Sequence, residues 1–121
     1  MDLNQLTSPY QGSTANTPNN YALSCGGYGN EQRFFAVLQP GEMIVIGQTS
    51  NTFDSRHELA VGGAYPGDSI VACRDDPDNS MESYTNNGNS AVNLYFTIDA
   101  YTTGSGDYTL EWTVTGIIFA S

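Results

Sequence analysis

The residues best suited to chemistry are carboxylates that gather in the middle of the chain. Asp76 and Asp78 stand two positions apart, and Ser80 and Glu82 continue the alternation. Oxygen ligands at alternate positions of a turning loop can surround a hard cation, and Ca²⁺ takes six to eight of them. The pattern predicts a calcium site, and its candidate ligands are Asp75, Asp76, Asp78 and Glu82. The alternative is a solvated acidic turn whose side chains hydrogen-bond the backbone.

The two cysteines, Cys25 and Cys73, allow one intramolecular pairing. A bridge would close a loop of about fifty residues and contribute roughly 4 kcal/mol in the chain-entropy model. Such bridges persist in oxidising compartments, whereas two buried free thiols are the alternative. We expect the disulfide.

Catalysis has little support in the residue pattern. His57 is the single histidine, and Asp54 and Ser55 precede it, but neighbouring residues on a strand point to opposite faces. A dyad of Cys25 and His57 is chemically feasible, yet Cys25 has a better use in a bridge. No nucleophile elbow, zinc signature or phosphate-binding glycine loop occurs. We therefore expect no enzyme, and a small hydrolase with paired carboxylates is the minor alternative.

The charge balance excludes several partners. Thirteen carboxylates face three arginines and no lysine, which gives a net charge of −10. Such a surface repels phosphate backbones and anionic lipid headgroups, so we expect no nucleic acid and no membrane insertion. The first residues contain no basic segment followed by an apolar run. We expect a domain of a longer secreted or cell-surface protein, with a cytoplasmic chain as the alternative.

Short apolar runs between turn residues predict the elements that position these groups. In 107–114, Tyr108, Leu110 and Trp112 alternate with polar residues, as in a half-buried antiparallel strand. Turn dipeptides such as Pro40-Gly41 separate the runs. The expected strands are 32–38, 42–48, 56–61, 69–73, 91–98 and 107–114, with one more edge strand in the first thirty residues. Strands at this spacing predict a single all-β domain over 1–121, an antiparallel β-sandwich of jelly-roll type.

Four motifs in order resemble the bacterial pre-peptidase C-terminal domain family. The run 101–110, Tyr-Thr-Thr-Gly-Ser-Gly-Asp-Tyr-Thr-Leu, resembles its closing hairpin, and 71–76, Val-Ala-Cys-Arg-Asp-Asp, resembles its Ala-Cys-Asn-Asp-Asp turn with Arg74 in place of Asn. Thr52-Phe53-Asp54 before 58–61 resembles an internal strand, and 24–41 resembles the opening strand and turn. The resemblance covers about 6–114 and leaves 115–121 as an apolar C-terminal extension.

The resemblance implies an accessory β-sandwich of a secreted bacterial protein. Family members are appended to exported proteases and other enzymes, and some bind substrate or calcium. We therefore expect a module that binds an extracellular polysaccharide or protein, or its parent enzyme, assisted by calcium. The alternative is a structural or adhesive subunit that assembles through its termini.

Two further features bear on binding. Exposed tyrosines among Asn, Ser and Gly are typical of adaptable binding surfaces, and they also pack over the ends of a sandwich. The candidates are Tyr10, Tyr21, Tyr28, Tyr65, Tyr84 and Tyr101.

The tail 116–121 carries three large apolar residues, Ile117, Ile118 and Phe119, which should not be exposed to water. We expect the tail to add a strand to its own sheet and the chain to be monomeric. The alternative is that the tail pairs with a neighbouring chain.

Overall fold

The computed structural model describes residues 1–75, 77, 79–100 and 104–116. A short 3-10 helix (Leu3–Gln5) precedes the strands, which are listed here in chain order. They are β1 (Tyr10–Ser13), β2 (Gln32–Leu38), β3 (Met43–Asn51), β4 (Ser55–Val61), β5 (Ser69–Arg74), β6 (Met81–Thr85), β7 (Val92–Ala100) and β8 (Asp107–Thr115).

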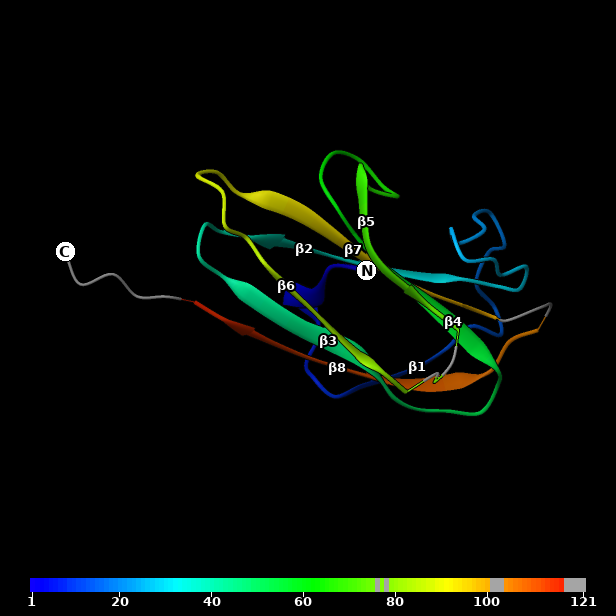
Figure 1. The fold of residues 1–121 in the computed structure, drawn as a ribbon. Helices are drawn as coiled ribbons and strands as arrows, with labels where there is room; N and C mark the ends of the chain where they lie inside the picture. The colour runs from blue at the N-terminus through cyan, green and yellow to red at the C-terminus, as the bar shows by residue number, and fades with distance from the viewer. Residues whose placement is uncertain (76, 78, 101–103, 117–121) are drawn as a thin grey trace.

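Across the described residues, the strands form two four-stranded antiparallel sheets that pack face to face (Figure 1). One sheet has the order β1-β8-β3-β6 and the other β2-β7-β4-β5, so every strand before β8 except β4 is followed along the chain by a strand of the opposite sheet. Eight strands in this order form a jelly roll. The predicted sandwich is confirmed.

The core lies between the sheets, where the alternating positions predicted from the sequence point inward. Phe34 from β2, Ile46 from β3 and Phe96 from β7 are completely buried. Tyr108 and Leu110 of β8 are also buried, while Val114 near the end of that strand is 42% exposed. Apolar burial is the dominant stabilising term, and the aromatic side chains supply much of its area.

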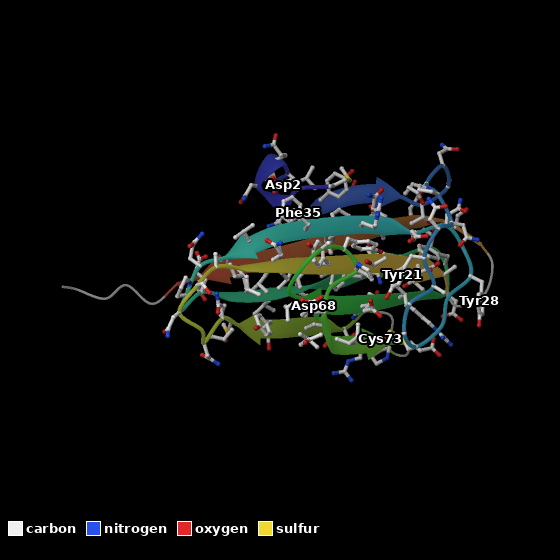
Figure 2. All side chains as sticks on the ribbon, turned by 90° about the horizontal axis from the view of Figure 1, so that it is seen from above. Asp2, Tyr21, Tyr28, Phe35, Asp68 and Cys73 are labelled. Carbon is white, nitrogen blue, oxygen red and sulfur yellow. A yellow bond between two sulfur atoms is a disulfide. The ribbon has the colours of Figure 1, made fainter. Side chains whose placement is uncertain are left out.

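One sheet is covered on its outward face as well. Tyr95, Thr97 and Asp99 of β7 point away from the core, yet all three are buried. The segment before β2 and the turn between β4 and β5 cover this face: the Tyr21 hydroxyl donates to Glu58, and the Tyr95 hydroxyl donates to the backbone carbonyl of the 62–68 turn. We call residues 14–31, which lie over the sheet, the cover segment. In Figure 2, Tyr21 and Tyr28 of this segment lie at the same end of the molecule as Cys73.

β1 is the edge strand expected in the first thirty residues. One strand differs from the expectation, because β6 lies in the stretch interpreted as an acidic turn. Glu82, expected as a loop ligand, is in a strand with its side chain directed into the sandwich. Among the described residues, no helix is long and apolar enough to cross a membrane.

Candidate functional site

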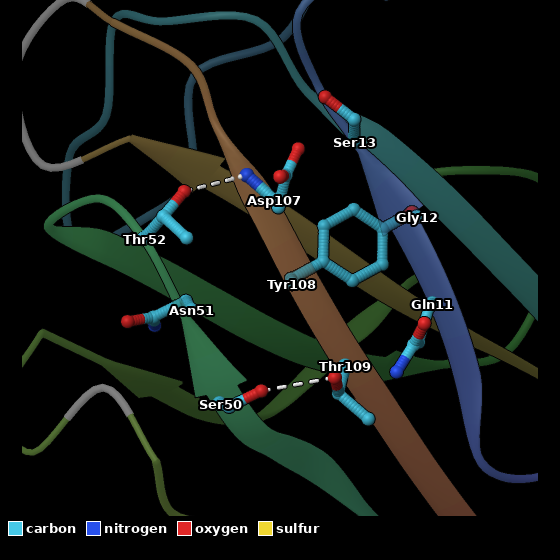
Figure 3. A pocket seen from close by; sticks show the side chains of 9 residues that line it. All are labelled: Gln11, Gly12, Ser13, Ser50, Asn51, Thr52, Asp107, Tyr108 and Thr109. Atoms are coloured by element: carbon cyan, nitrogen blue, oxygen red, sulfur yellow. Dashed lines mark hydrogen bonds between the residues drawn. The ribbon is translucent and has the colours of Figure 1, made fainter.

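A polar groove crosses the ends of β1, β8 and β3. Gln11 and Ser13 line one side, Ser50 and Thr52 line the other, and Thr109 lies between them (Figure 3). Its volume is about 600 Å³, within the range of about 300–1,000 Å³ typical of small-molecule sites. The lining consists mostly of hydroxyls and amides, and it contains one carboxylate, that of Asp107. We call this the β1–β3 groove.

Local backbone features shape the β1–β3 groove. A register shift between Gln48 and Ser50 in β3 turns Ser50 toward β8, where its hydroxyl donates to Thr109 Oγ1 at 2.9 Å. The Thr52 hydroxyl accepts from the amide of Asp107 at 2.8 Å. A Cβ placed on Gly12 would lie 2.5 Å from the Tyr108 hydroxyl, so only glycine leaves room for that ring beside β1. These contacts hold the lining side chains in place before a ligand arrives.

A buried polar cluster lies between the sheets behind this groove. Gln48 of β3 and Ser55 and His57 of β4 are completely buried. His57 Nδ1 lies 3.4 Å from Gln48 Nε2, and Ser55 Oγ donates to Gln48 Oε1 at 3.1 Å. Asn51 lines the groove and donates to both Gln48 Oε1 and Ser55 Oγ, at 3.3 and 2.9 Å. The cluster thus connects the groove with the interior.

The other ring nitrogen of His57 faces β6. His57 Nε2 lies 3.3 Å from Glu82 Oε1 and 3.3 Å from Ser80 Oγ. Arg74 Nε donates to the same Glu82 oxygen at 2.8 Å. Burial alone would raise the pKa of Glu82, but the hydrogen bonds from Arg74 and His57 outweigh it and hold the pKa below its usual range. Glu82 is therefore an internal anion that joins β4, β5 and β6.

Ser55 and His57 lie on the same face of β4, since they are two residues apart. Ser55 and His57 therefore both face the core, whereas Asp54 precedes the strand. The dyad of Cys25 and His57 is ruled out because Cys25 is bonded to Cys73.

The predicted disulfide is confirmed. Cys25 in the cover segment is bonded to Cys73 in β5. Arg56 stabilises the same region, because its guanidinium donates to the carbonyl oxygen of Cys25 and forms an ion pair with Asp75 at 3.2 Å. The bridge therefore fastens the cover segment across the edge of the sheet.

The predicted calcium ligands have different surroundings. Asp75 pairs with Arg56, and Glu82 pairs with Arg74 and His57. Asp76 and Asp78 lie outside the described residues. Within the described part of the chain, no group of three or more His, Cys, Asp or Glu side chains is placed to hold a metal ion. Calcium binding by this turn stays a prediction.

The tyrosines divide between packing and exposure. Tyr21, Tyr65 and Tyr95 form a row of edge-to-face contacts over the covered sheet, with ring centroids 5.5 and 5.6 Å apart. Burial and the hydrogen bond to Glu58 raise the pKa of Tyr21, so its hydroxyl stays protonated as a donor. Tyr28 is 63% exposed. Tyr10 and Tyr84 pack partly buried against the core, and Tyr101 and most of the tail, 117–121, lie outside the described residues.

Three buried carboxylates lie between the cover segment and the sheet, and the sequence did not indicate their burial. Glu31 and Glu58 are each 2% exposed and Asp99 is completely buried. Glu31 accepts from the amides of residues 20 and 21, and Glu58 accepts from the amide of Ser24. They satisfy the backbone of an otherwise irregular segment, which explains how it can lie flat on the sheet.

A second, smaller hollow of about 220 Å³ lies on the outward face of the covered sheet. Phe35, Tyr65 and Tyr95 line it together with Arg33, whose guanidinium carbon lies 4.6 Å from the centre of the Tyr65 ring. The arginine and the aromatic ring hold each other in place.

Comparison with known protein families, with curated proteins and with solved structures finds no match to this chain. Its function is therefore inferred from its own residues, and the β1–β3 groove is the candidate binding site.

Proposed function

We propose that the chain is a non-catalytic, extracytoplasmic accessory module that binds a neutral polysaccharide in the β1–β3 groove. The observation that carries this proposal is the lining, which presents hydroxyl and amide side chains in a preformed hollow of about 600 Å³. Sugar hydroxyls are both donors and acceptors, so they can match such a surface without burying an unpaired charge. The Cys25–Cys73 bridge supports an oxidising compartment.

The net charge favours a neutral ligand over a charged one. At −10, the protein repels anionic polysaccharides and nucleic acids over distances near the Debye length. Asp107 adds a local negative charge at the groove. A cationic polymer would be attracted to the whole surface without preference for the groove. Neutral glycans are the class that the groove would select.

The groove variants test this proposal. Gln11→Ala and Ser50→Ala each remove a polar group from the lining, and we expect each to weaken binding about fivefold, because a lost hydrogen bond costs about 1 kcal/mol. Binding is measured by affinity electrophoresis through gels that contain soluble neutral glucan, mannan or xylan.

Ser83→Ala is the matched control. Ser83 is an exposed residue of β6, in the same sheet but outside the groove, so its removal should leave binding unchanged. Retention by no neutral glycan, or equal loss in all three variants, would contradict the proposal.

A further inference from the structure

A serine hydroxyl and a glutamine amide meet inside the sandwich where solvent does not reach. Ser55 and Gln48 are both completely buried, and Ser55 Oγ donates to Gln48 Oε1 at 3.1 Å. A carbonyl bond of about 1.23 Å then places Oγ roughly 3.3–4.3 Å from Gln48 Cδ. Reacting atoms in a near-attack arrangement are about 3–3.5 Å apart. A small rotation of the glutamine side chain is enough to bring the hydroxyl onto the carbonyl carbon.

The same cluster contains a donor for a developing oxyanion. Asn51 Nδ2 donates to Gln48 Oε1 at 3.3 Å, and this oxygen would gain negative charge if Oγ added to Cδ. Asn51 Nδ2 also donates to Ser55 Oγ at 2.9 Å, so one amide positions both reacting groups. Such a donor is worth more in a buried site than in water, because the local dielectric is low.

The histidine faces the group that would leave. His57 Nδ1 lies 3.4 Å from Gln48 Nε2, and the opposite ring nitrogen lies 3.3 Å from Glu82 Oε1. The Gln48 Nε2 amide can only donate, so His57 Nδ1 accepts from it and the Nε2–H of the ring donates to Glu82, whose carboxylate Arg74 fixes with a bond of 2.8 Å. An amide nitrogen leaves readily only when it is protonated, so a proton carrier at this position lowers the barrier to amide cleavage.

We propose that the folded chain joins Ser55 to Gln48 through an internal ester bond. Ser55 Oγ forms a bond to Gln48 Cδ, and the Cδ–Nε2 bond breaks. The hydroxyl proton ends on Gln48 Nε2, the nitrogen that His57 faces, and the nitrogen leaves as ammonia. No oxidant or other reactant is required. Ammonia is protonated in water and diffuses away, which opposes the reverse reaction, while burial keeps water from hydrolysing the ester.

The bond would have a mechanical role that is independent of the binding proposal. β3 belongs to one sheet and β4 to the other, so the ester joins the two sheets covalently. Asn51 belongs to both the groove and the cluster, and the link would therefore also fix one wall of the β1–β3 groove. A cross-link of this kind would oppose separation of the two sheets under mechanical force.

Intact mass spectrometry of the reduced, full-length wild type tests the proposal. The ester makes the protein about 17 Da lighter than its sequence, the mass of the ammonia released. Trypsin cleaves after Arg33 and Arg56, so the deficit should lie in the peptide 34–56, with no backbone fragment ions between residues 48 and 55. Apart from a brief trypsin digestion near neutral pH, samples are kept acidic because base hydrolyses esters. A wild type with the full sequence mass overturns the proposal.

Two variants separate the ester from other losses of ammonia. Ser55→Ala should restore the full mass, whereas Thr49→Ala, at an exposed neighbour of Gln48, should keep the deficit. A cyclised Asn51 also loses ammonia but gives normal fragment ions between 48 and 55 and persists in Ser55→Ala, and that result overturns the ester. The fragment-ion pattern of the wild type decides the question even if Ser55→Ala does not fold.

Discussion

At the scale of residues, burial gives the acidic and polar side chains roles that their sequence positions do not reveal. Glu82 stands in an acidic run, yet inside the sandwich it joins three strands through Arg74 and His57. Asp99 accepts a hydrogen bond from the amide of Ala100 at 2.7 Å, while its Oδ2 has no hydrogen-bond partner. A sequence pattern shows the spacing of residues along a strand, but it does not show which outward face of a sheet another segment will cover. The roles of buried acidic residues are therefore the hardest to predict.

Asp99 should make the protein more stable in mild acid. Burial, the largest cause, and the charge of Glu31 raise its pKa from 3.8 to about 6, although backbone amides and Arg56 oppose this. The folded state holds the proton more tightly than the unfolded state. The stability from this group is therefore complete below pH 4 and is lost as pH rises through 6.

Between pH 7 and pH 5, wild type should gain about 1 kcal/mol in free energy of unfolding relative to Asp99→Asn, since the variant has no such proton to bind. Urea denaturation at both pH values measures the difference. Glu111→Gln, which removes a carboxylate from the sheet β1-β8-β3-β6, serves as the control and should follow the wild type. Parallel pH profiles for wild type and Asp99→Asn would contradict the assignment.

At the scale of elements, the alternation of apolar and polar residues predicted the strands that have one polar face. It did not predict a strand whose formation depends on its pairing with other strands. β2 matches its expected range, and β3, β4, β5, β7 and β8 differ by a few residues at their ends. β6 was missed because the acidic residues before it indicate a loop. β1 is the edge strand expected in the first thirty residues, and only its bounds could not be given, because Gly12 weakens its pattern. The polar groove could not be predicted either, since it depends on a register shift in β3 and on the pairing of β1 with β8.

Reduction of the Cys25–Cys73 bridge should release the cover segment. The bridge restricts the unfolded chain, and its loss from a small domain costs about 2–5 kcal/mol, so the thermal midpoint should fall. Hydrogen exchange should rise first in the cover segment, because the bridge fastens it to β5.

Thermal melts and hydrogen-exchange mass spectrometry, with and without reductant, measure these effects. Exchange in β8, which lies in the other sheet, provides the internal control. An unchanged midpoint after complete reduction, verified by a mass gain of two hydrogen atoms, would show that the bridge adds no stability.

At the scale of the whole molecule, the net charge of −10 means that any cation stabilises the fold slightly by screening repulsion between carboxylates. An experiment must therefore distinguish specific calcium binding from this general screening. The expected ligands are Asp75, Asp76, Asp78 and Glu82. Calcium would compete for Asp75 with Arg56 and for Glu82 with Arg74 and His57. A strongly acidic jelly roll can bind Ca²⁺ at a defined turn or attract it diffusely. The two cases differ in ion selectivity and in the response to single substitutions.

Millimolar Ca²⁺ should raise the thermal midpoint more than equal Mg²⁺ if the turn holds the ion, because Mg²⁺ demands octahedral geometry and keeps its water. Asp76→Asn should abolish the calcium-specific shift. Asp2→Asn removes the same charge next to β2, at the opposite edge of the sheet from β5, and should retain the shift. Differential scanning fluorimetry at constant ionic strength measures all three proteins. Small, equal shifts with both ions in all of them would assign the effect to screening, and calcium would then have no specific place in the binding function.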